Sequence, residues 1–508
     1  MLIFILTLSR KSFIFILQLC NRGVQGSFFQ GSLSDMSFSD LFFIYFFLPI
    51  CLLCYYGSKS SRTRNTILIA FSLVFYAWGR PVWVLLLLLS AAVNYIIALR
   101  LGPDKDDTFK KAFLAVALIF NIGMLLVFKY TGFFVENLNL IFRTSIPVPA
   151  ISQPIGLSFY TFRAISYILD VYWGKSKAQK SFKEYLLYVS FFPHMMAGPI
   201  VRYGTMEPDL SKRRTNPMDM YEGTLRILVG LAKKVILADH LIVIADSLFG
   251  ANLSGLSTIG TWYGAAIYML YVYFDFSGYS DMAIGIARLF GFHFEENFNY
   301  PFLCRNIQEF WQRWHISLGT FFRDYLLYVP LFGKRRKYAS LFLVWFCTGF
   351  WHGASWNYIL WGLYYGCFVF MEEKLGRKKL KAWPVWWKHL YSMLVVVVGF
   401  GIYYFTDVKR IGQFLLNISG INLIINRTGL LDVVTKSSFR GHIFLIIIAV
   451  AACFPIVPKL KAAAAKTEND ELFAVMKIAA AVICLVFLIV CSIMLVNSTN
   501  SPFLYWNY

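Results

Sequence analysis

The 508-residue sequence has few charged residues and lacks the short motifs of the common soluble enzyme classes. Charged residues make up 15% of the chain, against about 25% in an ordinary soluble domain. The GxSxG nucleophile elbow, the HExxH zinc motif and the phosphate-binding P-loop are absent, and so is the His-x4-Asp motif of glycerolipid acyltransferases. These absences exclude the α/β-hydrolases, the HExxH zinc proteases and the P-loop nucleotide hydrolases.

Cysteine is present but forms no metal-ligand pattern. Of the nine cysteines, Cys51 and Cys54 make a CxxC within the apolar run 48–56. No second CxxC and no nearby histidine pair completes a zinc site, and cysteine in apolar surroundings behaves as a small hydrophobic residue. We therefore expect no metal site in this protein and no redox role for these two thiols.

Hydrophobic side chains dominate the sequence. They make up 58% of the residues, aromatic residues alone make up 19%, and the mean hydropathy is +0.59. Long apolar runs recur along the chain, each close to the roughly 20 residues that a helix needs to cross a bilayer. The sequence therefore predicts a multi-pass integral protein of the cell membrane, in contact with membrane lipid.

The net charge of +21 raises the question of nucleic-acid binding. The basic residues lie in short clusters between apolar runs, at residues 62–64, 110–111, 212–214, 334–337, 377–381 and 459–466. This is the pattern of cytoplasmic loops under the positive-inside rule. The clusters have few interleaved aromatic residues, which a nucleic-acid surface would show. We therefore expect no nucleic-acid partner.

The apolar runs predict an all-α fold, a polytopic transmembrane helical bundle of about 10–12 membrane segments. The expected helices cover residues 38–57, 65–79, 82–100, 112–129, 184–201, 221–250, 258–290, 339–371, 386–406, 442–458 and 472–496. The runs 221–250 and 339–371 are long enough to be tilted, broken or split into two helices. No linker interrupts the series, so residues 36–508 are expected to form a single transmembrane domain.

The first 35 residues differ from the rest of the chain. Arg10 and Lys11 split their apolar stretches, and the first stretch is not preceded by the basic region that a signal peptide requires. Met36 then opens a natural entry to the first long helix. We expect residues 1–35 to be a non-native or poorly structured extension, whose removal leaves activity unchanged.

Among seven histidines, His352 stands out because it lies within the apolar segment 345–361. An ionisable side chain inside a membrane segment is costly, so it is a functional candidate by default. Gly349 and Ser355, at helical spacing from it, would leave room for a substrate, and Trp351 would contribute an apolar wall. The alternative is a core histidine that is hydrogen-bonded to a neighbouring helix.

A second histidine, His315, lies in the segment 305–321, which is amphipathic when read as a helix. Its polar face carries Arg305, Gln308, Gln312, His315 and Gly319, and its apolar face carries Ile307, Phe310, Trp314 and Phe321. Such a helix is too polar to meet lipid all round, so we expect it to be re-entrant or to line a cavity. His315 and Gln312 would then face the cavity, and Trp314 would pack into protein. An interfacial helix lying flat on the bilayer is the alternative.

Two carboxylates, Asp275 and Asp281, are bracketed by apolar sequence in the run 271–282. Carboxylates at membrane depth serve as proton relays or orient a histidine or arginine, so both are candidates for lining or positioning roles in a substrate path. A structural helix break held by Gly278 explains the run equally well.

Motifs in a fixed order resemble those of the bacterial membrane-bound O-acyltransferases. They are FPHMMAGP at 192–199, GLAKK at 230–234, YFDFSGYSD at 273–281, NFNYPF at 297–302, FWQRWHISL at 310–318, RDY at 323–325, GFWHG at 349–353 and SPFLY at 501–505. The resemblance covers roughly residues 36–508. Within the family, the run 325–333 is closer to the alginate type than to the teichoic acid type.

The resemblance implies that His352 is the catalytic histidine and that His315 is its partner along a central tunnel surrounded by re-entrant helices. A neutral buried imidazole can take the proton of an attacking hydroxyl during acyl transfer. Gln312, Asn306 or backbone amides could bind the developing oxyanion, and the sequence does not choose among them. Trp314 would support the same tunnel.

The resemblance also implies the substrates. An acetyl or other acyl group would pass from a cytoplasmic thioester such as acetyl-CoA, with no bound cofactor, to hydroxyls of an extracytoplasmic polysaccharide. The transfer would be direct or would use an extracytoplasmic partner, expected to be an SGNH-type acetyltransferase. Two alternatives stay open: D-alanyl transfer to teichoic acid and, from another class, a sugar or lipid transporter or flippase, which broken helices and buried carboxylates also fit.

Overall fold

The computed structural model of the chain describes residues 36–103, 105–250, 253–328, 336–425, 429–466, 470–497 and 502–504. Within these ranges the chain is built from helices and contains no strand, so the predicted all-α class is confirmed. The proposed extension 1–35 lies outside the described residues.

The N-terminal part begins with a short helix and ends in one long helical stretch, Asp107–Phe142. Its segments are η2 (Phe43–Phe47), α3 (Leu48–Gly57), α4 (Ser61–Ala77), α5 (Val82–Arg100), α6 (Asp107–Leu125), η3 (Leu126–Tyr130) and α7 (Thr131–Phe142). The Asp106 carboxylate accepts the N–H of Thr108 at 2.9 Å and so caps the start of α6. From α6 to α7 the helix continues through η3, a π-helical turn, and such turns are frequent at functional sites.

The next helices are shorter and more deeply buried. They are α8 (Leu157–Tyr172), α9 (Phe182–Ser190), α10 (Phe192–Met195) and α11 (Tyr203–Ser211). Every residue of α8 from Leu157 to Val171 is buried. Hydropathy does not predict this helix, because Arg163, Asp170 and several hydroxyl-bearing residues weaken its apolar pattern. The expected helix 184–201 is wrong in its second half, where only the four-residue α10 follows the break.

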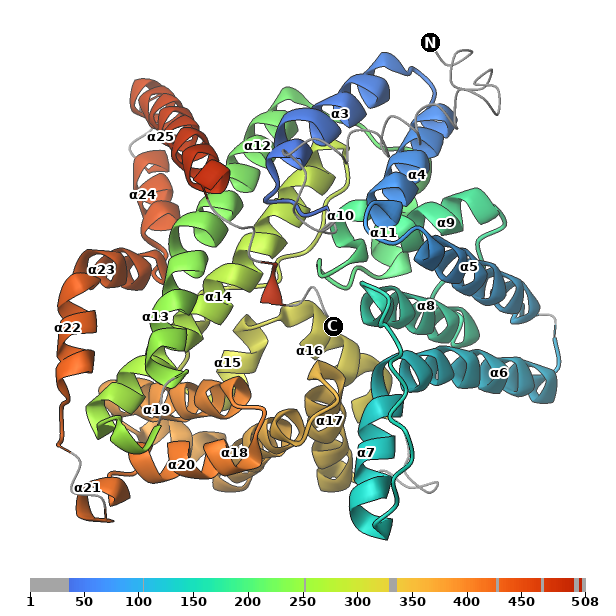
Figure 1. Cartoon of the computed structure of the whole chain (residues 1–508). Helices are drawn as coiled ribbons and strands as arrows, with labels where there is room; N and C mark the ends of the chain where they lie inside the picture. The colour runs from blue at the N-terminus through green and yellow to red at the C-terminus, as the bar shows by residue number, and fades with distance from the viewer. Residues whose placement is uncertain are drawn as a thin grey trace, which may run out of the picture.

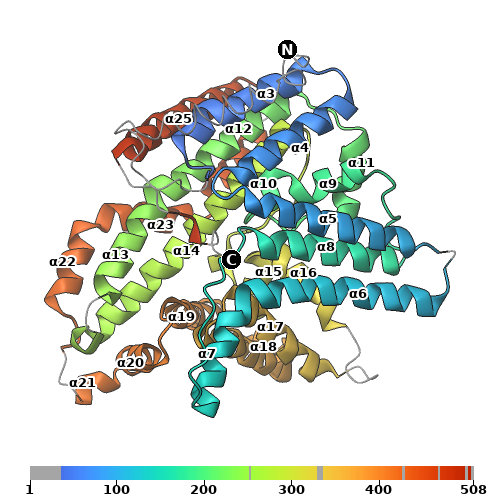
Figure 2. The same cartoon turned by 45° about the vertical axis from the view of Figure 1, so that its right-hand side comes forward.

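Two long helical segments form the middle of the molecule. This part comprises α12 (Pro217–Ala232), η4 (Lys233–Ala238), α13 (Asp239–Phe249), η5 (Leu253–Gly255) and α14 (Thr258–Leu289). α14 packs against α12, η4 and α13, and it crosses the centre of the molecule beside them (Figure 1, Figure 2). A Cβ atom on Gly230 would come within 2.6 Å of the backbone oxygen of Gly278. Glycine therefore permits the close approach of these two helices.

The chain then passes through short turns into a pair of packed helices. The segments are η6 (Pro301–Leu303), α15 (Ile307–Arg313), α16 (Ile316–Phe322), η7 (Arg323–Leu327), α17 (Lys337–His352) and α18 (Trp356–Ala382). α17 packs against α18. The long run 339–371 is thus split into two helices, which is one of the outcomes that the sequence allowed.

The C-terminal helices wrap around this core. They are α19 (Val385–Tyr404), α20 (Val408–Ile418), α21 (Ile421–Ile425), α22 (Val433–Gly441), α23 (Ile443–Ala452), α24 (Ile456–Ala465) and α25 (Asp470–Asn497). Figure 1 shows α22 to α25 along one side of the molecule, and α25 packs against α12. The segment 502–504 returns to the centre, where the N–H of Leu504 donates to the Asp275 carboxylate at 2.8 Å.

Four helical stretches of the described chain are long and apolar enough to cross a membrane. They are Val82–Arg100, Asp107–Phe142, Val385–Tyr404 and Asp470–Val496. A fifth span results if α22 and α23, which are bent by 67° at their junction, are taken together. By length and composition, the described residues therefore contain four or five candidate membrane spans, fewer than the predicted 10–12 membrane segments. Helices enclosed by other helices, such as α14, need no continuous apolar surface and therefore fail such a test.

Candidate active site

His352 is the last residue of α17, and only 3% of its surface is exposed. Its ring centroid lies 4.8 Å from that of Trp351, 4.8 Å from that of Trp361 and 5.5 Å from that of Tyr403. The Tyr403 hydroxyl lies 3.3 Å from Nδ1 of His352. The imidazole therefore occupies an aromatic enclosure in which α19 supplies a polar partner.

The small residue one helical turn before His352 serves helix packing. A Cβ atom on Gly349 would collide with the backbone oxygen of Tyr358 and lie 3.2 Å from the Cα of Gly362. The expectation that Gly349 leaves room for a substrate is therefore wrong, because α18 fills that space. The close contact of α17 with α18 instead fixes the helix end from which the His352 side chain projects.

Two residues of η3, Lys129 and Tyr130, form hydrogen bonds with the last turn of α17. Nζ of Lys129 donates to the backbone oxygen of Trp351, and the Tyr130 hydroxyl donates to that of Phe350 at 2.7 Å. The rings of Tyr130 and Phe350 also stack, with centroids 4.0 Å apart. The final carbonyls of a helix have no donor within the helix, so these bonds satisfy two of them. Lys129 was not among the residues predicted from the sequence, although it is, like His352, an ionisable residue in an apolar run.

The segment around His315 is not the continuous helix that its spacing predicted. α15 ends at Arg313, Trp314 is extended, and His315 adopts φ 43° and ψ 55°, in the left-handed region. α16 then starts at Ile316. This turn separates the two halves of the predicted polar face. As a result His315 is buried whereas Gln312 is exposed.

The structure brings His315 and His352 together through one tryptophan. The ring of His315 meets Phe276 edge-on at 4.6 Å and lies 6.1 Å from the ring of Trp351. Trp351 also contacts His352. On its other side, Nδ1 of His315 lies 3.1 Å from Oδ1 of Asn297. Both histidines are thus buried and in contact with Trp351.

Trp314 packs into protein, as a cavity-lining segment requires. It is buried, its ring stacks on Phe310 at 5.5 Å, and it lies 5.0 Å from Phe400. This burial contradicts the interfacial alternative, in which these aromatic residues would anchor the segment in lipid. The Asn306 side chain accepts the N–H of Glu309 at 2.7 Å and caps α15. The Asn306 amide therefore has a structural role at the start of α15.

The two candidate carboxylates of α14 lie in ion pairs. Asp275 accepts from Lys234 at 2.8 Å, with both side chains buried. Asp281 pairs with Arg226 at 2.9 Å and with Lys233 at 2.6 Å. A charge removed from water needs such partners. The pairs connect α14 to α12 and η4, so the structure gives both carboxylates a cross-linking role between central helices.

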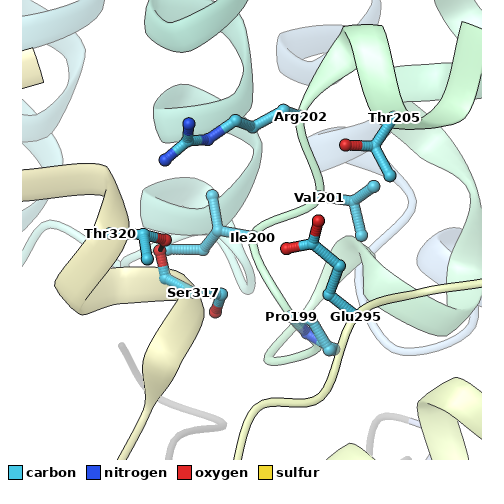
Figure 3. Close-up of a pocket in the computed structure, with 8 residues that line it drawn as sticks. All are labelled: Pro199, Ile200, Val201, Arg202, Thr205, Glu295, Ser317 and Thr320. Atoms are coloured by element: carbon cyan, nitrogen blue, oxygen red, sulfur yellow. Dashed lines mark hydrogen bonds between the residues drawn. The ribbon is translucent and has the colours of Figure 1, made fainter. Parts of the chain in front are cut away.

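A small pocket lies beside Ser317, which contacts the Asn297 partner of His315. Its lining residues are Pro199, Ile200, Val201, Arg202, Thr205, Glu295, Ser317 and Thr320. Figure 3 shows Arg202 and Thr205 on one side and Ser317 and Thr320, from α16, on the other. The Arg202 guanidinium pairs with Asp324 at 2.6 Å, and the Ser317 hydroxyl donates to Asn297 at 2.9 Å. Ser317 thus lines the pocket and also contacts Asn297, so its side chain connects the pocket to the Asn297–His315 contact.

Comparison with known proteins shows the family to which the chain belongs. The model of the membrane-bound O-acyltransferase family matches residues 175–413, which include His315 and His352. An Azotobacter vinelandii protein named probable alginate O-acetylase is 40% identical in an alignment of length 382 that covers 72% of this chain and 75% of the relative. The chain belongs to the membrane-bound O-acyltransferase family. The predicted resemblance is confirmed, and with it the class of enzyme and its location in the membrane.

Other relatives of this O-acyltransferase have different acceptors in their names. The peptidoglycan O-acetyltransferase of Helicobacter pylori is 37% identical in an alignment of length 364 that covers 65% of this chain and 69% of the relative. The teichoic acid D-alanyltransferase of Bacillus subtilis is 29% identical in an alignment of length 359 that covers 64% of this chain and 88% of the relative. Because the chain belongs to an acyltransferase family, the acyltransferase interpretation is preferred to the transporter or flippase alternative.

Proposed function

We propose that this O-acyltransferase moves an acetyl group from a cytoplasmic thioester such as acetyl-CoA to hydroxyls of an extracytoplasmic polysaccharide. The observation that carries the proposal is the pair of buried histidines, His315 and His352, both in contact with Trp351. The names of two relatives support the acceptor class, because alginate and peptidoglycan are both envelope or surface polysaccharides.

His352 is assigned the role of general base. Its Nε2 can take the proton of the attacking hydroxyl if Nδ1 carries a hydrogen and donates it to the Tyr403 oxygen, 3.3 Å away. The hydroxyl oxygen attacks the thioester carbonyl, an ester bond forms, and the C–S bond breaks. The proton held by His352 then passes to the departing thiolate. His315 is assigned to positioning or polarising a reactant on the acyl path.

The acyl group reaches the glycan directly or through an extracytoplasmic partner of the SGNH type. The absence of a GxSxG elbow in this chain supports both routes over a serine-bound intermediate of the hydrolase type.

D-alanyl transfer to teichoic acid is the second candidate. The Bacillus subtilis D-alanyltransferase favours it, since the alignment covers 88% of that relative. Its identity of 29% is lower than the 40% of the alginate-type relative, so the acetyl transfer is placed first.

The test is chemical analysis of the cell envelope after deletion of the gene and complementation. The wild-type gene is expected to restore alkali-labile acetyl esters, and His352→Ala, at equal protein level, to lower them by on the order of 10² or more. Ester content that survives in the His352→Ala strain contradicts the assignment. D-alanyl esters are measured in the same samples, and their loss in place of acetyl esters would favour the second candidate.

A further inference from the structure

One asparagine side chain holds the turn that carries His315. Oδ1 of Asn297 lies 3.1 Å from Nδ1 of His315, and it accepts the backbone N–H of Ser317 at 3.2 Å and the hydroxyl of Ser317 at 2.9 Å. The backbone oxygen of Asn297 accepts the N–H of Ile316 at 2.9 Å. Asn297 is 1% exposed, and its Nδ2 donates to Ser280 at 3.0 Å. A single buried residue thus contacts three consecutive residues of the turn.

The turn needs this support because of its backbone. His315 lies in the left-handed region, which is disfavoured for a residue with a Cβ atom. Such a conformation persists when the surrounding structure holds it, and it is frequent at functional sites. Asn297, which lies outside the turn, stabilises this conformation through its hydrogen bonds. It also caps the first turn of α16 by accepting the N–H of Ser317.

The same contacts determine which nitrogen of His315 carries the hydrogen. The backbone N–H of Ser317 can only donate, so the atom of Asn297 that faces it must be the acceptor oxygen. That oxygen also faces Nδ1 of His315, which must therefore donate. In a neutral imidazole, Nε2 is then the acceptor nitrogen.

We propose that Asn297 is a positioning residue for acyl transfer. It fixes the ring orientation and the tautomer of His315, so that Nδ1 keeps its hydrogen and Nε2 presents its lone pair toward the reactants. The proposal rests on the proposed function, in which His315 acts on the acyl path. Without Asn297, the His315 ring can rotate or exchange its hydrogen between the two nitrogens.

The test uses three variants of the full chain, with acetyl-ester content of the envelope as the readout. Asn297→Leu keeps the approximate size but removes the acceptor, and it should lower transfer by on the order of 10². Asn297→Asp keeps an acceptor oxygen at the same place and should recover most of that loss. Ser280→Ala removes only the contact on the far side of Asn297 and should stay close to wild type.

These variants separate positioning from packing. If Asn297 only filled space, leucine would be tolerated at least as well as a buried carboxylate, which carries a desolvation cost. Full transfer in Asn297→Leu, or equal loss in folded Asn297→Leu and Asn297→Asp, would overturn the proposal.

A second measurement does not depend on the variants folding. Solid-state NMR of the wild-type protein with ¹⁵N-labelled histidine reports which ring nitrogen is protonated, and the His315 signals are assigned by their absence in His315→Gln. We expect the hydrogen on Nδ1, and a hydrogen on Nε2 would overturn the inference. If His315→Gln keeps full transfer, the role of His315 in the proposed function fails, whereas the NMR result still decides what Asn297 does.

Discussion

The Nδ1 atom of His352 faces the hydroxyl of Tyr403, while Trp351 and Trp361 cover two sides of the ring. An enclosed histidine with a polar contact at one nitrogen is oriented by that contact. In the proposed chemistry the Tyr403 oxygen accepts the Nδ1 hydrogen, so that Nε2 is left to take a proton from the acceptor hydroxyl.

Tyr403→Phe should therefore slow acyl transfer without abolishing it. A single neutral hydrogen bond contributes about 0.5–1.5 kcal/mol, which corresponds to roughly a 2- to 13-fold loss of rate. Tyr404→Phe is the matched control, because the neighbouring hydroxyl donates to Asp246 on the exposed side of α19. Acetyl-ester content after equal expression is the measurement, and equal behaviour of the two variants would contradict the orienting role of Tyr403.

The sequence could single out His352 as a candidate because it is an ionisable residue in an apolar segment, and His315 because it lies on the polar face of an amphipathic segment. Their supporting residues gave weaker signals. Tyr403 is one of 30 tyrosines in a chain rich in aromatic residues, and its position next to His352 arises only when α19 packs against α18. Asn297 precedes His315 by 18 residues in an irregular stretch, so no helical or strand period relates the two.

At the scale of the helices, the broken segment around His315 shows what periodicity cannot predict. The polar residues at spacings of three and four continue across Trp314, although the helix does not. A left-handed histidine has no sequence signal comparable with that of glycine. The apolar face was nonetheless predicted correctly, since Ile307, Phe310 and Phe321 are all buried.

The contact of α17 with α18 leads to a prediction about Gly349. Gly349→Ala forces the two backbones apart, because the added Cβ collides with the Tyr358 oxygen. Overpacking of this kind costs about 1–3 kcal/mol, and it displaces the helix end at His352. We expect a lower melting temperature of the detergent-solubilised protein and reduced transfer.

Gly123→Ala is the control for this effect. Gly123 lies within α6, where a Cβ atom meets nothing within 4 Å. Alanine in an open helical position should leave the melting temperature unchanged or raise it slightly. If Gly349→Ala were as stable and active as Gly123→Ala, the close packing of α17 on α18 would not fix the site.

For the whole molecule, hydropathy predicted the fold class, and fewer helices of the described chain pass a test of length and apolar composition than the predicted number of membrane segments. α8 and α14 illustrate the difference. α8 is buried along almost its whole length and holds Arg163, whose guanidinium donates to the backbone oxygens of Val189 and His194. A helix enclosed by protein can carry such groups, because its neighbours and not lipid satisfy them. The hydropathy pattern therefore predicted the enclosed helix α14 at residues 258–290 but not α8, whose apolar pattern is weakened by polar residues.

The enclosed helix α14 also contacts the candidate site. Asp275 and Asp281 on α14 are paired with lysine and arginine residues of α12 and η4, and Phe276 between them contacts His315. The ion pairs therefore hold the helix against which His315 packs. Asp275 and Asp281, which the sequence offered as candidates for a proton path, therefore have cationic partners that connect helices in the folded chain.

Membrane vesicles made from cells that express the full chain give the most direct test of the account. They are supplied with [¹⁴C]acetyl-CoA on their cytoplasmic face, and the alkali-labile label in the envelope polysaccharide is counted. The account predicts steady incorporation with the wild-type protein and background incorporation with His352→Ala at equal protein level. Equal labelling with the two proteins, or none with the wild type while its acetyl esters form normally in the cells, would contradict it.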